Sequence, residues 1–151
     1  MNGNNKIKKV MHSFHEINRG FYSLLNNEIA QLGVTVKQLL VLRTLKEEPD
    51  ISLGELAERL QVGCSTMSGI VDRLVKAGYL FRERSEKDRR SLLIRLTKEG
   101  TEKQKECENI FMEQMSKILD IPDQDLEQLL QLHHLLLEKM KTKGAEIKND
   151  E

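Results

Sequence analysis

The sequence predicts a mainly α-helical protein with one small β-hairpin. Along most of the 151 residues, apolar side chains recur at steps of three and four, which is the period of helices buried on one face. Residues 79–96 instead alternate around a polar turn, as in a hairpin. The order helix, short turn, helix, hairpin predicts a winged helix-turn-helix, flanked by N- and C-terminal helices within one domain of residues 1–151.

The first two helices are set by their apolar spacing and by their end signals. Helical spacing covers about residues 5–31, and Gly33 follows as a stop signal. Thr35 can cap a second helix that runs to about Glu47 before the break at Pro49. Its inward-facing residues are expected to be Val36, Leu39, Leu40 and Leu45. The winged lobe is therefore expected to begin at about residue 35.

The next two helices have the arrangement of a helix-turn-helix. Ser52 and Glu55 have the spacing of a capping box, in which the hydroxyl and the carboxylate each accept a backbone N–H. Residues 61–63 form a short turn, and a helix over 64–76 follows, with Gly78 as its stop. The inward face of that helix is expected to carry Met67, Ile70, Val71, Leu74 and Val75.

The hairpin and the C-terminal helices complete the chain. Two short strands within 79–84 and 91–96 enclose the turn at 85–88, and the lobe ends at about residue 97. Thr97 can cap a helix over about 98–118, and Pro122 marks the start of the next. From Lys141 onward the chain is polar and is expected to fray, so the C-terminal helices cover about 98–142.

Charge and side-chain size indicate a nucleic-acid surface. The exposed face of the 64–76 helix begins with the short polar residues Ser65, Thr66 and Ser68, which allow a helix to sit close to base edges in the major groove. Residues 73–95 carry eight basic and three acidic side chains, an excess of five positive charges in a chain of formal net charge zero. Cations on an exposed hairpin can contact a DNA backbone or minor groove.

Nearly all of the 151 residues, and most specifically the segment KDRRSLLIRLTKEG, resemble the MarR (multiple antibiotic resistance regulator) family. The resemblance implies a homodimer, joined by the helices at about 5–31 and 98–142, that binds a pseudo-palindromic duplex through recognition helix 64–76 and wing 82–94 and usually represses transcription. It also implies that Arg90 enters the minor groove while Asp88 holds it by an ion pair. A departure is Gly63, where many members carry a better capping residue. The expected DNA contacts are Ser65, Thr66, Ser68, Arg73, Arg84, Lys87, Asp88, Arg89 and Arg90.

The same resemblance implies a small aromatic effector, bound between the dimerisation helices and the DNA-binding lobe. The candidate ligand residues are Phe14, Ile17, Phe21, Leu39 and Arg43, and the alternative for each is an ordinary core position. Cys64 lies at a helix N-terminus, which can make a thiol reactive, so it is either a redox switch or a small packing residue.

Other functional classes lack their sequence signatures. The chain has no GxxxxGK[ST], GxGxxG, HExxH or GxSxG motif, so we expect neither an enzyme nor a cofactor. The histidine pairs at 12/15 and 133/134 lack further ligands at metal-binding spacing, so no metal site is expected. Two distant cysteines and no apolar run of about 20 residues favour a cytoplasmic protein without a membrane partner. The alternative function is a winged-helix protein-interaction module that does not bind DNA.

Overall fold

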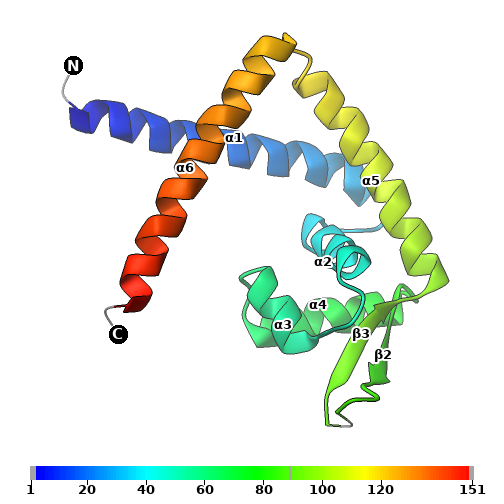
Figure 1. The fold of residues 1–151 in the computed structure, drawn as a ribbon. Coiled ribbons are helices and arrows are strands. Elements are labelled where there is room, and N and C mark those ends of the chain that lie inside the picture. Colours follow the sequence, from blue (N-terminus) through cyan, green and yellow to red (C-terminus); the bar gives the residue numbers. More distant parts are fainter. Residues whose placement is uncertain (1–2, 89, 150–151) are drawn as a thin grey trace. The chain divides into compact units, whose positions relative to one another are not determined.

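The structure, a computed structural model, describes residues 3–88 and 90–149 and confirms a mainly helical fold with a small sheet (Figure 1). The chain divides into two compact units, Met1–Met112 and Glu113–Glu151. The first unit contains α1 (Gly3–Ala30), α2 (Val36–Glu47), β1 (Ile51–Ser52), α3 (Leu53–Arg59), α4 (Cys64–Lys76), β2 (Leu80–Arg84), β3 (Leu92–Leu96) and most of α5 (Lys98–Ile118). The second contains the end of α5 and α6 (Asp123–Asn149).

The predicted helix starts are present, with one difference at α3. Thr35 and Gln38 form a full capping box, in which each side chain accepts the other residue's backbone N–H at 3.1 Å. At α3, Ser52 Oγ accepts the Glu55 N–H at 3.2 Å as expected, but the Glu55 carboxylate accepts the Ser52 hydroxyl at 3.3 Å. The predicted return bond to the Ser52 backbone was therefore wrong. Ser52 also belongs to a strand, whose pairing with β3 sets its backbone conformation.

The sheet has one strand more than the predicted hairpin. β2 and β3 pair antiparallel with Arg82 opposite Ile94, and β1 joins the other edge of β3 with Ile51 opposite Ile94. A two-residue strand is too short to show the alternation by which strands are recognised in a sequence. The third strand anchors the chain between α2 and α3 to the wing, so the hairpin is built into the lobe.

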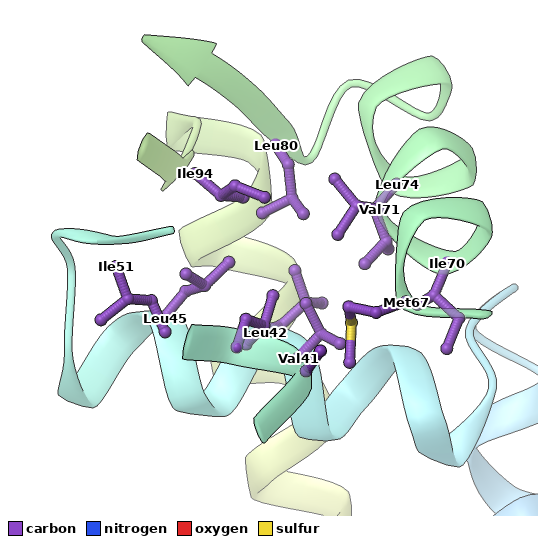
Figure 2. Packing of buried hydrophobic residues seen from close by; sticks show 12 residues of the cluster. Val41, Leu42, Leu45, Ile51, Met67, Ile70, Val71, Leu74, Leu80 and Ile94 are labelled. Atoms are coloured by element: carbon purple, nitrogen blue, oxygen red, sulfur yellow. The ribbon is translucent and has the colours of Figure 1, made fainter. Parts of the chain in front are cut away.

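The core of the first unit lies between α2, α3, α4 and the sheet (Figure 2). Met67, Val71 and Leu74 of α4 are buried against this core, as predicted. On α2 the prediction was wrong for Leu40, which is 41% exposed, whereas the neighbouring Val41 and Leu42 are fully buried. The run of four apolar residues at 39–42 leaves the rotation of the helix undetermined in the sequence, and packing against α4 and β3 selects it.

The two glycines predicted to end helices have the backbone conformation expected at a helix C-terminus. Gly33 and Gly78 both have positive φ, at 74° and 83°, a region that glycine enters without steric cost.

In the second unit, α6 continues to Asn149, so the predicted fraying from Lys141 was wrong. Lys141 pairs with Glu138 one turn earlier at 3.1 Å, which supports helix in this polar segment.

Candidate nucleic-acid interface

The outer face of α4 consists of small polar groups. Because Met67, Ile70, Val71 and Leu74 point into the core, the opposite side of the helix faces solvent. Ser65, Thr66 and Arg73 are exposed there, and Ser68 is half-buried. The structure therefore brings the four predicted α4 contacts to one accessible surface.

The first turn of α4 offers backbone donors on the same surface. The N-cap residue Gly63 makes no side-chain capping bond, in agreement with the departure noted from the sequence. The first N–H groups of a helix have no intrahelical acceptor, and the helix dipole gives that end a partial positive charge. Without a capping side chain, these donors remain suited to an anion such as a phosphate.

The tip of the wing, residues 85–91, is organised by Asp88. Its backbone N–H donates to Ser85 Oγ at 3.3 Å, and its backbone carbonyl accepts the Ser91 N–H at 3.0 Å. Its carboxylate accepts the Arg90 backbone N–H at 3.1 Å and the Ser91 hydroxyl at 3.2 Å. In the described part of the chain, these bonds stand in place of the predicted ion pair between Asp88 and the Arg90 guanidinium. Arg89, the other predicted arginine at the tip, lies outside the described residues.

Two arginines of the sheet are paired with carboxylates. Arg82 pairs with Asp72 of α4, and Arg95 pairs with Glu83 at 2.6 Å and Asp50 at 2.7 Å. Two of these three carboxylates, at positions 50 and 72, lie outside the 73–95 segment in which charge was counted. The local excess of five therefore overstates the positive charge offered to solvent. The predicted surface also exposes Arg73, Lys76, Arg84, Lys87 and Arg90.

The predicted ligand residues do not come together at one site. Leu39 and Arg43 line a cavity of about 40 Å³ between α1, α2 and α5. Phe14, Ile17 and Phe21 lie on α1 and do not line it, and Ile17 is 52% exposed. The volume is close to that of one water molecule and far below the roughly 300 Å³ at which small-molecule pockets usually begin.

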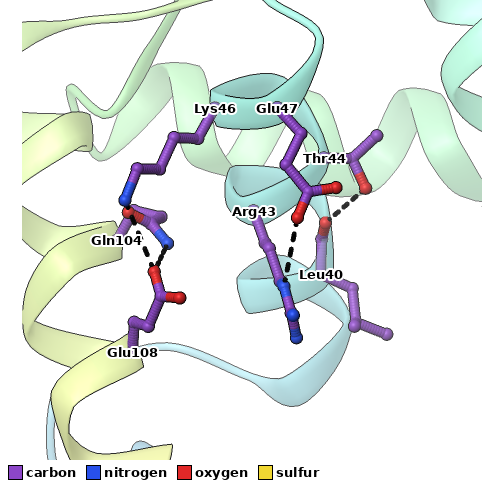
Figure 3. Close-up of polar contacts among 7 residues, drawn as sticks. All are labelled: Leu40, Arg43, Thr44, Lys46, Glu47, Gln104 and Glu108. Atoms are coloured by element: carbon purple, nitrogen blue, oxygen red, sulfur yellow. Dashed lines mark hydrogen bonds and ion pairs between the residues drawn. The ribbon is translucent and has the colours of Figure 1, made fainter.

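Polar residues also lie where α2 meets α5, a region called here the α2–α5 seam (Figure 3). Sequence reasoning missed three of them, Lys46, Gln104 and Glu108. Gln104 is fully buried and donates through Nε2 to Glu108 Oε2 at 2.6 Å, and Glu108 also pairs with Lys46 of α2 at 3.5 Å. The Gln104 hydrogen bond, and then Lys46 and Arg43, lower the pKa of Glu108. Arg43 stacks over the Phe111 ring at 5.7 Å. The spacing of 104, 108 and 111 places these residues on one helix face, a signal that a helical wheel would have given.

The two cysteines differ in environment. Cys64 is exposed at the start of α4, whereas Cys107 is buried, and burial raises the pKa of the Cys107 thiol. Among the described residues, no group of three or more histidine, cysteine or acidic side chains is arranged to hold a metal ion. Within the same residues, no helix has the length and apolar character needed to span a bilayer.

Comparison with known proteins gives a consistent family relationship. The model of the MarR family matches residues 34–92. Over 135 residues the chain is 30% identical to the organic hydroperoxide resistance transcriptional regulator of Bacillus subtilis, and the match covers 87% of this chain and 86% of that regulator. A shorter match is to the helix-turn-helix transcriptional regulator YfiV of the same organism, with 34% identity over 71 residues. This match covers 47% of this chain and 44% of YfiV. The chain thus spans less than half of that second relative.

A solved structure shares the fold. The crystal structure of a mutant MarR from E. coli, complexed with operator DNA, has a TM-score of 0.74 to this chain and is 24% identical to it. The similarity covers 91% of this chain and 99% of that one. Helices before and after the winged lobe are therefore part of the shared architecture.

Proposed function

This chain belongs to the MarR family of transcriptional regulators, and we propose that it acts as a homodimeric repressor that binds a pseudo-palindromic duplex site through α4 and the wing. The observation that carries the proposal is the juxtaposition, in one unit, of an exposed polar helix face with a hairpin that bears exposed cations. A relative that matches 87% of this chain is named a transcriptional regulator, and a structural neighbour is complexed with operator DNA. The family is one of regulators rather than enzymes.

In the proposed complex, α4 lies in the major groove. The hydroxyls of Ser65, Thr66 and Ser68 reach base edges or phosphates, because short side chains let the helix approach closely. Arg73, further along the same helix, contacts the backbone or a guanine. The uncapped first turn of the helix receives a phosphate.

The wing contacts the neighbouring minor groove and backbone. Arg90 enters the minor groove, and Asp88 orders the tip by holding the Arg90 backbone. Arg84, Lys87 and Arg89 supply charge to phosphates, although Arg89 lies outside the described residues. These contacts account for affinity more than for sequence preference, which comes from α4.

We propose that the flanking helices, at about residues 5–31 and 98–142, join two chains. α1 exposes Ile7 (63%) and Met11, and α6 exposes Leu130 (68%) and Leu137, which a second copy would cover. Two-fold symmetry would then present the recognition helices about 34 Å apart, one turn of DNA. The predicted cytoplasmic location depends on this proposal, because the DNA target would lie there.

Two regulatory predictions remain separate from this proposal. A small aromatic effector needs a larger cavity than the 40 Å³ at Leu39 and Arg43, so binding would have to open the α2–α5 seam. Oxidation of Cys64 would place a polar group beside Ser65 and Thr66 and should weaken DNA binding. If peroxide leaves the DNA affinity unchanged, Cys64 is not a redox switch, and its exposed side chain also does not fit the alternative of a packing residue.

The test combines duplex binding with solution mass. Fragments selected from genomic DNA should contain a palindrome, affinity should fall as salt rises, and the chain should have the mass of a dimer. Arg90→Ala should lose about 1–3 kcal/mol of binding free energy, whereas Lys105→Ala, an exposed α5 cation, should not. A chain that binds no duplex at low salt would instead be a protein-interaction module.

A further inference from the structure

A carboxylate lies on the face of α4 that is proposed to meet DNA. Asp72 follows Ser65 by seven residues and Ser68 by four, so the three share one side of the helix. Its side chain is 53% exposed. Next to a phosphate backbone, an uncompensated carboxylate is repelled and weakens binding.

Arg82 of β2 compensates that charge. Its guanidinium pairs with Asp72 Oδ1, which links the recognition helix to the wing. The Arg82 side chain is 34% exposed, so the pair lies at the surface and not in the core. As long as Arg82 holds Asp72, the pair contributes no net charge to the interface.

A second arginine of the sheet, Arg95, is paired in a different environment. Arg95 bridges Glu83 and Asp50 at 2.6 and 2.7 Å, so loss of one carboxylate still leaves it paired. Within the described part of the chain, Arg82 is held by a single carboxylate, on the DNA-facing helix. Surface ion pairs are weak and easily exchanged for another anion. Removal of the Asp72 charge would therefore free Arg82 for a phosphate.

We infer that Asp72 sets the DNA affinity of this regulator by withholding Arg82 from the phosphate backbone. The inference rests on the proposed function. A phosphate that captured Arg82 would leave Asp72 uncompensated on the same face, and the repulsion would offset the new contact. Asp72 thus limits sequence-independent attraction, which leaves the α4 contacts a larger share in selecting the site.

The test measures binding of a random-sequence duplex over a range of salt concentrations. Asp72→Asn should bind more tightly than wild type, and its plot of log affinity against log salt should steepen by about 0.9, the value for one added phosphate contact. Asp72→Ser should give the same result. The double variant Asp72→Asn/Arg82→Gln should return to the wild-type slope, because it lacks the freed cation.

Controls separate this mechanism from simpler ones. Asp120→Asn removes the same charge outside the lobe and should leave the slope unchanged. If the double variant keeps the steeper slope, or if Asp72→Asn binds less tightly than wild type, the inference is wrong. If the wild-type chain binds duplex and Asp72→Asn has the same salt slope as wild type, the inference alone is overturned. If the wild-type chain binds no duplex, the proposed function is overturned as well.

Discussion

Gly100 of α5 lies against the backbone carbonyl of Tyr79, so closely that a Cβ on Gly100 would fall 1.9 Å from that oxygen. The Thr97 N–H donates to the same Tyr79 carbonyl at 3.0 Å. The start of α5 is therefore held by a hydrogen bond and a close packing contact to the segment that joins α4 to β2. A movement of α5 relative to this segment would therefore break these contacts.

Gly100→Ala should destabilise the chain by about 1–3 kcal/mol or more, because the methyl group meets a backbone atom that cannot rotate away. The measurement is urea unfolding at a fixed protein concentration. Gly54→Ala is the matched control, since its Cβ would have 4.0 Å to the nearest atom, and it should be neutral or stabilising by about 0.5–1 kcal/mol. Equal stability of the two variants would contradict the close contact.

The Thr97 hydroxyl should contribute to stability through two bonds at the same contact. It accepts the Gly100 N–H at 2.9 Å and donates to the Gly78 carbonyl at 2.6 Å. Thr97→Val keeps the shape but loses both bonds and should cost about 0.5–2 kcal/mol, whereas Thr97→Ser should retain most of the stability. Thermal unfolding of the two variants tests this prediction. A serine variant as unstable as the valine variant would show that the Thr97 hydroxyl does not stabilise the chain.

Substitutions at Asp88 can separate its backbone bond from an ion pair. Asp88→Asn keeps an acceptor for the Arg90 N–H and should bind DNA at least as well as wild type. Asp88→Ala loses that acceptor and should weaken binding, because the tip that carries Arg90 is no longer ordered. Duplex affinity measures both. A loss in the asparagine variant equal to that in the alanine variant would show that charge pairing with an arginine matters instead.

Glu108 should make the free energy of unfolding depend on pH in the acidic range. Because the Gln104 hydrogen bond and Lys46 lower its pKa in the folded chain, the stabilisation is complete above the ordinary glutamate pKa of about 4.3 and is lost as pH falls through the lowered value. Glu108→Gln should therefore be less stable than wild type at pH 7, and the difference should shrink toward pH 3. Urea unfolding at both pH values tests this, and a difference that does not change with pH would exclude the carboxylate as its source.

Much of the fold could be predicted because its signals are local. The bounds of α4 and α5 agree with the predicted 64–76 and 98–118, since Gly78 and Thr97 mark helix ends by their own chemistry. The outward face of α4 could be predicted for the same reason, because its apolar stripe fixes which side is buried. β1 could not be predicted, because two residues carry no periodic pattern and their partners in β3 lie far along the sequence.

The candidate site was predictable in its residue types but not in its pairings. Ser65, Thr66 and Arg73 could be placed on one surface from helical spacing alone. That Arg82 is held by Asp72, and that Gln104 is buried against Glu108, depends on which elements meet.

By itself, the sequence determined where most helices begin and end, which face of α4 is polar, and that cations gather on the hairpin, because these properties follow from neighbours one or two turns apart. Only the tertiary structure decided which of those cations are neutralised, how α2 is rotated, and where α5 is fastened. Ion pairs and close contacts depend on distances between elements, and packing sets those distances.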